Sequence, residues 1–459
     1  MADYRIEKDS MGEMKVPQSA LWGASTQRAV ENFQISGIKF PRQFIAALGL
    51  IKRASATVNN ELGLISAEIC EAITLTSKRV EQGELDDHFV VDIFQTGSGT
   101  STNMNVNEVI ANYIKTNLKL AAHPNDHVNA SQSSNDVIPT AMHISAALGW
   151  QNELKPALVK LHKSLEDKSN EFSTIVKTGR THLMDATPIT LGQEFGGYAA
   201  QVKNSIERVE RSLTSILELP LGGTAVGSGV NTHPNYASKT IQFIAKDTGL
   251  GFFEARNHFE AQAAKDGIQD FASALKGVAV ALSKVANDIR FLGSGPRCGL
   301  GELLLPEVQP GSSIMPGKVN PVIAESLLMV CAQVIGFENT VTVSNQLGSN
   351  FELNVMMPVM TRSILESITL LAKGSDNFRT RCVEGIEPNL ERIKFLAEAN
   401  ITIVTALVPK IGYDLSAKLS KEALSSNRSL REVVLESKVM TKDELDQALD
   451  LIKMTKPGL

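Results

Sequence analysis

The fold class is indicated by the stretch Phe271-Ala-Ser-Ala-Leu-Lys-Gly-Val-Ala-Val-Ala-Leu-Ser-Lys-Val-Ala-Asn-Asp-Ile289. Its large apolar side chains recur every three or four residues, which places them on one stripe of an α-helix: Phe271, Leu275, Val278, Leu282, Val285 and Ile289. A second stripe has the same period: Val202, Ile206, Val209, Leu213 and Ile216. Long one-sided helices joined by glycine-rich loops predict an all-α fold with a central long-helix bundle.

The chain outside these stripes divides into shorter helical patterns. Before the bundle we expect helices over 44–61 and 66–82, and after it over 390–399, 429–439 and 442–453. Thr441 followed by Glu444 has the spacing of a capping box at a helix start. The sequence shows no alternation of strand and helix patterns, so a parallel α/β sheet is not expected. We therefore predict three domains: 1–135, mostly helical; 136–390, the bundle; and 391–459, a small helical domain.

Composition excludes several classes of protein. The 459 residues include 43% hydrophobic and 21% charged residues, a mixture typical of a folded globular chain rather than a disordered one. Lys plus Arg number 45 and Asp plus Glu 50, a net charge of −5, which argues against a nucleic-acid-binding protein. The first residues lack the apolar segment of a signal peptide, and no run of about 20 uninterrupted apolar residues suggests a membrane span. We expect a cytoplasmic protein.

The cysteines do not indicate a metal centre. Cys70, Cys298, Cys331 and Cys382 form no Cys-x-x-Cys pair, so neither zinc nor an iron–sulfur cluster is predicted. We expect all four to act as small apolar core residues.

Two loop segments in the first third of the chain are unusually rich in glycine and small polar residues. The first spans 95–108 and contains Gly97, Ser98, Gly99 and Thr100; it is consistent with an anion cradle at a helix N-terminus or with a plain glycine-rich cap. The second, 123–137, holds two His, three Asn, three Ser and two Asp ahead of an apolar helix, more polar residues than a helix cap needs. His123 and His127 are four residues apart, but Pro124 and the lack of a third ligand argue against a metal pair.

Two further loop segments follow. In 178–189, His182 lies among Arg180, Thr181 and Asp185, and an imidazole pKa near 6.5 suits proton transfer. His88, His143, His162 and His258 lack such surroundings and are interpreted as structural. In Gly311-Ser-Ser-Ile-Met-Pro-Gly-Lys-Val-Asn-Pro321, glycine and serine flank a fixed cation, Lys318. This pattern is typical of a lid over an anionic substrate, or otherwise of a mobile surface loop with a solvated lysine.

The last segment resembles the signature of the fumarase/aspartase superfamily, and the other three resemble blocks of that superfamily in the same order. Gly179-Arg-Thr-His-Leu183 is similar to class II fumarase, whereas aspartate ammonia-lyases typically carry Gln in place of His182 and Ala in place of Gly317. The resemblance implies an iron-independent enzyme without metal or cofactor, assembled as a homotetramer around the central bundle, with each active site built from three subunits. It also implies reversible hydration of the small dicarboxylate fumarate to (S)-malate.

The resemblance assigns roles residue by residue. Catalytic roles fall on His182, Ser312 and Glu325, with Glu325 paired to His182. Substrate contacts fall on Ser98, Gly99, Thr100, Ser133, Ser134, Asn135, Thr181, Ser313, Lys318, Val319 and Asn320. A second, peripheral dicarboxylate site falls on His123, Pro124, Asn125 and Asp126. Many relatives carry Arg three residues before this histidine, where this chain has Leu120 next to Lys119.

Two alternatives remain open at this level. An aspartate ammonia-lyase would use the same scaffold to eliminate ammonia instead of water. A non-catalytic structural oligomer would reuse the helical bundle without the chemistry. Ultraviolet absorbance of fumarate, followed after addition of malate or aspartate, discriminates among the three.

Overall fold

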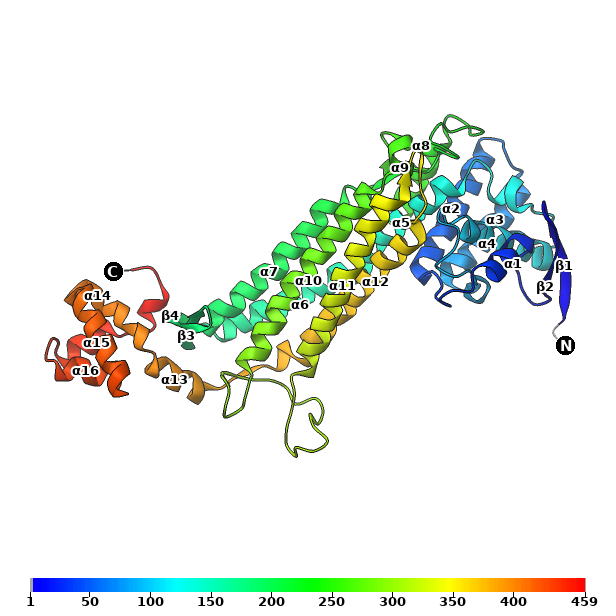
Figure 1. Ribbon diagram of the computed structural model, residues 1–459. Helices are drawn as coiled ribbons and strands as arrows, with labels where there is room; N and C mark the ends of the chain where they lie inside the picture. Colours follow the sequence, from blue (N-terminus) through cyan, green and yellow to red (C-terminus); the bar gives the residue numbers. More distant parts are fainter. Residues whose placement is uncertain (1–2, 459) are drawn as a thin grey trace. The chain divides into compact units, whose positions relative to one another are not determined.

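The computed structural model describes residues 3–458, and these are mostly helical, as predicted (Figure 1). The helices are α1 Ala24–Asn32, α2 Arg42–Glu61, α3 Ala67–Gln82, α4 Thr100–Tyr113, α5 Ser134–Gly149, α6 Lys155–Glu171, α7 Leu191–Leu213, α8 Tyr236–Thr248, α9 His258–Ala263, α10 Asp266–Leu292, α11 Val322–Gly348, α12 Met357–Arg381, α13 Leu390–Ala399, α14 Val408–Ile411, α15 Tyr413–Ser426, α16 Leu430–Glu436 and α17 Lys442–Ala448. Short π-helical turns cover Ile114–Leu118, Pro124–Val128 and Trp150–Leu154.

Strands occur only as two-stranded pieces within the described residues. They are β1 Tyr4–Asp9 with β2 Gly12–Pro17, β3 Val176–Thr181 with β4 Met184–Thr190, β5 Glu218–Leu219 with β6 Phe253–Glu254, β7 Leu303–Leu304 with β10 Glu387–Pro388, and β8 Ser349–Asn350 with β9 Leu353–Asn354. The pair β3–β4 corrects one expectation, because the segment 178–189 was predicted to be a loop. Its antiparallel register is interrupted by a bulge between Thr178 and Gly179.

The long helical patterns are confirmed. Phe271, Val278, Val285 and Ile289 of α10 are completely buried. Of the second stripe, Val202, Ile206, Val209 and Ile216 are buried and Leu213 is partly exposed; α7 ends at Leu213, so Ile216 belongs to the turn that follows the helix. The predicted helices 44–61 and 66–82 match α2 and α3 within two residues. Ser66 caps α3 by accepting a hydrogen bond from the backbone N–H of Ile69.

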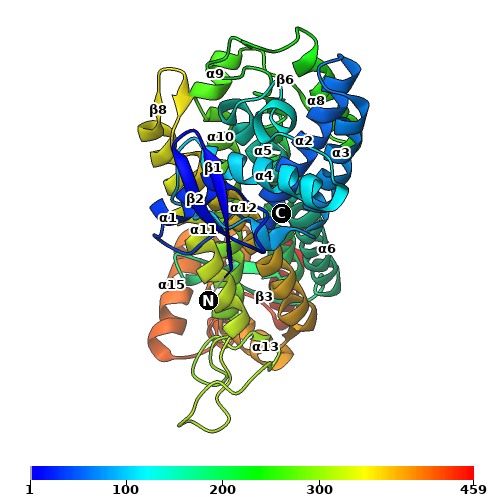
Figure 2. The same cartoon turned by 90° about the vertical axis from the view of Figure 1, so that its right-hand side faces the viewer.

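The chain forms two compact units. Unit 1 comprises residues 1–156, 206–279 and 330–373. In it α2 packs against α3, α5 and α8, and both views show α2 and α3 side by side (Figures 1 and 2). Unit 2 comprises residues 157–205, 280–329 and 374–459, and in it α13 packs on β3. The division into three domains stays a prediction.

The C-terminal helices of unit 2 form a small apolar core that includes Leu419, Leu430, Val433 and Leu445. The capping box predicted at Thr441 is confirmed, and Ser429 forms another at the start of α16. Both helices are shorter than predicted, ending at Glu436 and Ala448. The sequence analysis did not predict α15, which packs against α16.

Helix α11 stands out by its apolar composition. An 18-residue window of it reaches a mean hydropathy of 1.4, so by length and composition alone this helix could cross a membrane, a test that core helices of water-soluble proteins also pass. Only 28% of that window is buried within the chain. Met329 and Leu347 are 68% and 59% exposed. The helix therefore carries more apolar surface than the rest of the chain covers.

Candidate active site

The first predicted block forms a tightly packed turn into α4. Gly99 adopts φ +73° directly before the helix, and the Ser98 and Thr100 hydroxyl oxygens are 2.7 Å apart. A Cβ on Gly97 would overlap the carbonyl of Val355, so this position has no room for a side chain. The Gln95 side-chain oxygen accepts hydrogen bonds from the N–H and hydroxyl of Thr102, which holds the turn against α4. Hydroxyls at the N-terminus of a 14-residue helix suit a carboxylate.

The second block begins α5. Ser133 is its N-cap and shares a capping box with Asp136: the Ser133 N–H donates to Asp136 Oδ1 at 2.9 Å. Asn135 Nδ2 donates to the carbonyl of Ala225 at 2.8 Å. Ser134 is buried, and its hydroxyl oxygen accepts a hydrogen bond from Asn103 Nδ2 at 3.1 Å. This block thus fulfils the capping role and also has polar groups beyond what a cap requires.

Unit 1 brings these two blocks together. Asn103 of α4 bonds to Ser134, and a Cβ on Gly99 would lie 2.9 Å from the side chain of Ile138 on α5. At the start of α5 lies a cavity of about 180 Å³. It is lined by Ser131, Gln132, Ser133, Thr224, Ala225, Val230 and Asn231.

The segment around Thr224 was missed by the sequence analysis. Thr224 has φ +54°, which is rare for a β-branched residue, and its buried hydroxyl has no hydrogen-bond partner within the described chain. Gly222, Gly223, Gly227 and Gly229 give this segment the same glycine-rich composition that marked the four predicted blocks. That composition was the signal that could have found it.

Asp136 ties the second block to the missed segment. Its carboxylate is fully buried and accepts hydrogen bonds from the N–H groups of Gly222 and Thr224 at 3.0 and 2.9 Å. Burial raises the pKa of Asp136 to about 6, while the N–H groups of Ser133, Thr224 and Gly222 act in the opposite direction. The start of α5 is therefore fixed by the buried carboxylate of Asp136.

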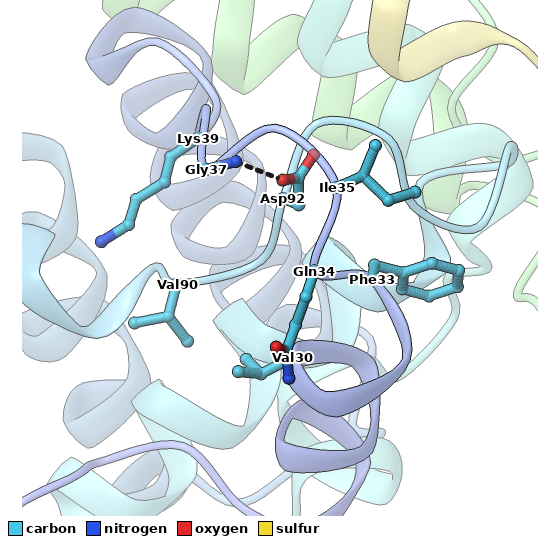
Figure 3. Close-up of a pocket in the computed structure, with 8 residues that line it drawn as sticks. All are labelled: Val30, Phe33, Gln34, Ile35, Gly37, Lys39, Val90 and Asp92. Carbon is cyan, nitrogen blue, oxygen red and sulfur yellow. Dashed lines mark hydrogen bonds between the residues drawn. The ribbon is translucent and has the colours of Figure 1, made fainter.

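A larger cavity lies between the segments 30–39 and 90–92. Its volume is about 330 Å³, and it is lined by Val30, Phe33, Gln34, Ile35, Gly37, Lys39, Val90 and Asp92 (Figure 3). Asp92 Oδ2 accepts hydrogen bonds from the N–H groups of Ser36 and Gly37, both at 2.7 Å. Burial opposes ionisation of Asp92, but its hydrogen bonds outweigh that effect and lower its pKa. Because its one carboxylate braces the loop, this cavity is not a candidate for the active site.

The third block lies in unit 2, at the tip of the β3–β4 hairpin. Thr181 pairs with Met184, so His182 and Leu183 form the two-residue turn, with φ of +58° and +62°. Both side chains are exposed. The His182 ring forms no hydrogen bond within the described chain, which leaves it available to a substrate or to another subunit.

Buried ion pairs anchor the hairpin from behind. Glu302 is completely buried and accepts two hydrogen bonds from the Arg180 guanidinium, both at 3.0 Å. Lys177 Nζ is 3.0 Å from Glu194 and 3.2 Å from Glu302. Arg180 and Lys177 both belong to β3, so these pairs fix the strand that ends at Thr181.

The fourth block closes on itself through hydrogen bonds. Ser312 Oγ accepts hydrogen bonds from the N–H groups of Ile314 and Met315 at 3.3 and 3.1 Å. The Lys318 ammonium donates to Asn320 Oδ1 at 2.6 Å, and Asn320 Nδ2 donates to the Gly311 carbonyl at 2.7 Å. N–H groups aimed at a serine oxygen stabilise its alkoxide form.

The remaining predicted contacts of this block are exposed. Ser313, Lys318 and Val319 all face solvent, and the apolar Ile314 is 84% exposed. Glu325 is half-buried in the first turn of α11. No hydrogen bond or ion pair joins Glu325 to His182 among residues 3–458, so the predicted pairing is not formed within one chain.

The segment predicted as a second dicarboxylate site forms a short π-helical turn, Pro124–Val128, in unit 1. His123 Nδ1 accepts hydrogen bonds from the N–H groups of Asn125 and Asp126 at 3.3 and 3.1 Å. His123 and Asp126 are both exposed. His123 therefore caps the turn from an exposed position.

His143, His162 and His258 have structural surroundings. His143 is buried, its Nδ1 is 2.8 Å from the Glu218 carbonyl, and burial lowers its pKa to about 4. His162 and His258 likewise contact backbone carbonyls. Cys331 and Cys382 are buried, but Cys298 is exposed, so the expectation that all four cysteines are core residues is wrong for Cys298. In the described part of the chain, no three His, Cys, Asp or Glu side chains are grouped to hold a metal ion.

Comparison with known proteins gives consistent matches. A family model described as Lyase matches residues 12–336, and one described as Fumarase C C-terminus matches residues 403–456. The chain is 52% identical over 458 residues to the class II fumarate hydratase of Corynebacterium glutamicum, covering 98% of this chain and 96% of the relative. It is 49% identical over 460 residues to that of Mycobacterium tuberculosis, covering 99% and 97%. The crystal structure of a class II fumarase from Schistosoma mansoni matches with a TM-score of 0.95 at 36% identity, covering 99% of both chains.

Proposed function

The chain belongs to the class II fumarate hydratase family, and from that membership we propose that it hydrates fumarate to (S)-malate and catalyses the reverse reaction. The observation that supports this reaction best is the Ser312 oxygen, which accepts hydrogen bonds from two backbone N–H groups in a loop that also holds Lys318. A general base for a weakly acidic C–H needs such stabilisation, since an isolated serine hydroxyl is a poor base.

In the dehydration direction, Ser312 takes the proton from C3 of malate. The negative charge that develops spreads onto the adjacent carboxylate. Lys318 and Asn320 are suited to donate to those oxygens, and each donor contributes roughly 3 kcal/mol in a water-excluded site. His182, polarised by Glu325, protonates the hydroxide that leaves C2; in the hydration direction the same imidazole activates the attacking water.

Carboxylate binding is assigned to both units. Ser98, Gly99, Thr100, Ser133, Ser134 and Asn135 in unit 1, with Thr181, Ser313 and Val319 in unit 2, complete the substrate contacts. Because Ser134 already bonds to Asn103, its contribution is to hold its neighbours in place as well as to donate. His123, Pro124, Asn125 and Asp126 form the peripheral dicarboxylate site.

We further propose a cytoplasmic homotetramer in which three subunits build each active site. The exposed apolar side chains of α11 support association, since burial of such surface drives the assembly of subunits. The lack of a His182–Glu325 contact within the described chain supports a site completed by other subunits.

A substrate panel tests the reaction. Malate, fumarate, aspartate and argininosuccinate are each offered to the purified protein, and the ultraviolet absorbance of fumarate is followed. We expect absorbance to rise with malate and to fall when fumarate alone is supplied in water. Fumarate formed from aspartate instead would identify an ammonia-lyase, and no change with any substrate would identify a non-catalytic oligomer.

A further inference from the structure

Lys52 is a buried cation that has no assigned role in the reaction described above. It lies on α2 in unit 1 and is completely buried. Its ammonium donates three hydrogen bonds, to Asn103 Oδ1 at 2.9 Å, Asn129 Oδ1 at 3.0 Å and Gln132 Oε1 at 2.9 Å. All three acceptors are neutral amides, whereas a buried lysine is normally paired with a carboxylate.

The three acceptors belong to the two segments that carry the predicted carboxylate contacts. Asn103 lies in the first turn of α4, three residues after Thr100. Gln132 directly precedes Ser133, and the carbonyl of Gln132 accepts a hydrogen bond from Asn129 Nδ2 at 3.1 Å. Lys52 therefore bonds to both blocks of unit 1 from beneath.

The amides pass this contact on to the candidate site. Asn103 Nδ2 donates both to Ser134 Oγ and to Asn129 Oδ1, each at 3.1 Å. Loss of the ammonium would leave Asn103 Oδ1 and Gln132 Oε1 without a donor, whereas Asn129 Oδ1 would keep its hydrogen bond from Asn103 Nδ2. Both blocks would then be free to shift by the few tenths of an ångström that matter for donor geometry.

Charge gives a second reason to retain a lysine here. Burial lowers the pKa of Lys52 to about 7, an effect that the nearby Asp136 carboxylate partly opposes. The three amide oxygens bond best to the ammonium form, which has three N–H donors. A methionine of similar length would avoid the free-energy cost of burying a charge. Keeping a lysine here therefore requires a favourable interaction that offsets this cost. Attraction of the carboxylates of a substrate supplies one.

We propose that Lys52 is a positioning residue for the hydration reaction, fixing the Ser98–Thr100 and Ser133–Asn135 blocks relative to each other and placing a positive charge behind their donors. This inference rests on the proposed function, because it assumes that those blocks bind a dicarboxylate. A purely structural lysine would instead contribute only to folding.

Arg53 offers a matched control on the next residue of the same helix. It is also buried, and its guanidinium bonds to Glu81 at 2.6 and 2.9 Å and to Asp247 at 3.1 and 2.7 Å. These partners lie on or next to α3 and α8 and contact none of the predicted site residues. Arg53→Met therefore removes a buried charge and its hydrogen bonds without touching the site.

The test compares Lys52→Met with Arg53→Met in the full-length enzyme. Thermal unfolding, kcat, KM for malate and calorimetric binding of succinate, a dicarboxylate that cannot be dehydrated, are measured for both variants. We expect both to unfold at lower temperature. Only Lys52→Met should lose at least about tenfold in succinate affinity and in kcat/KM. Equal succinate affinity and kcat/KM in the two folded variants would overturn the proposal.

Asn103→Asp is a second test, which applies also if Lys52→Met does not fold. The new carboxylate still accepts from the Lys52 ammonium but cancels its charge, and it removes the donations of Asn103 Nδ2 to Ser134 and Asn129, so succinate should bind several-fold more weakly to the folded variant. Unchanged succinate affinity would contradict the role of the charge. Failure of the proposed function would appear differently, as a lack of turnover in the unsubstituted enzyme.

Discussion

The two units prepare their parts of the candidate site in opposite ways. In unit 1, the Ser98–Thr100 and Ser133–Asn135 blocks start long helices and are tied from below by Lys52 and Asp136, both completely buried. In unit 2, His182 is exposed at the tip of a hairpin, and Ser312 lies in a loop whose hydrogen bonds run mostly within the loop itself. On the proposed assignment of the site, we expect unit 1 to hold its carboxylate contacts in place before substrate binds and unit 2 to present His182 and Ser312 on exposed segments.

The strongest test of this comparison removes the reactive groups. Ser312→Ala and His182→Asn should each lower kcat by about 10²–10⁴-fold with a much smaller change in KM, because each acts in the chemical step rather than in binding. Steady-state kinetics with malate measure the effect. His162→Asn, which changes a histidine that only contacts the Ala199 carbonyl, is the control and should leave kcat unchanged. A loss confined to KM in both variants would assign the residues to binding.

Mixing these two inactive variants sharpens the result. If His182 and Ser312 of one site come from different subunits, tetramers reassembled from both variants contain some sites built wholly from intact copies, and activity returns in part. Mixtures that stay inactive would show that one subunit supplies both residues.

A smaller effect is expected from the anchor of the hairpin. Glu302→Gln removes the buried partner of Arg180 and Lys177, and breaking such a pair costs about 3 kcal/mol of unfolding free energy. A lower urea midpoint together with reduced kcat would show that the exposed hairpin turn with His182 depends on the ion pairs of Glu302. Arg256→Gln is the control. It breaks the ion pair between Glu218 and an Arg256 side chain that is 85% exposed, and it should leave the urea midpoint unchanged, as is typical of surface pairs. Equal midpoints for the two variants would contradict the anchoring role.

The smallest effect is a loss of stability at acid pH, caused by a buried histidine of unit 1. His143 on α5 has a folded-state pKa lowered to about 4, so below pH 6.5 the unfolded chain binds a proton that the folded chain refuses. Stability is fully present above pH 6.5 and is lost as the pH falls towards 4, by about 2 kcal/mol at pH 5 from this group. The urea midpoint of the enzyme should fall more steeply between pH 7 and 5 than that of His143→Asn. Parallel curves would remove His143 as the cause.

The sequence predicted those features that depend on near neighbours. The period of Phe271 to Ile289 and the Thr441–Glu444 box each act over a few residues, and both are confirmed. Lys52 was inside a predicted helix without a role, although its position among apolar residues of α2 was a signal. Its acceptors lie up to 80 residues away, and Glu302 is 122 residues from Arg180, so only tertiary structure pairs them.

The prediction of a loop at His182, where the structure has a hairpin, was wrong for a related reason. Short strands with glycine, threonine and proline resemble a loop in the sequence, whereas the ion pairs of Lys177 and Arg180 with Glu302 that anchor β3 join residues far apart in the chain. The Thr224 segment was missed although its glycines were visible in the sequence, because it contains no histidine, lysine or acid that suggested chemistry.

The turn at the tip of this hairpin also indicates which property selection has maintained. Two-residue turns with positive φ at both positions are best made by Asn-Gly, and each left-handed residue with a side chain costs about 1 kcal/mol or more. Here the two positions hold His182 and the exposed, apolar Leu183. Selection for a well-folded hairpin would have discarded both, so their presence is evidence that this turn has been maintained for what it touches rather than for its own stability. A chain freed from its reaction would be expected to drift towards Asn-Gly at this turn, becoming more stable as it became inert.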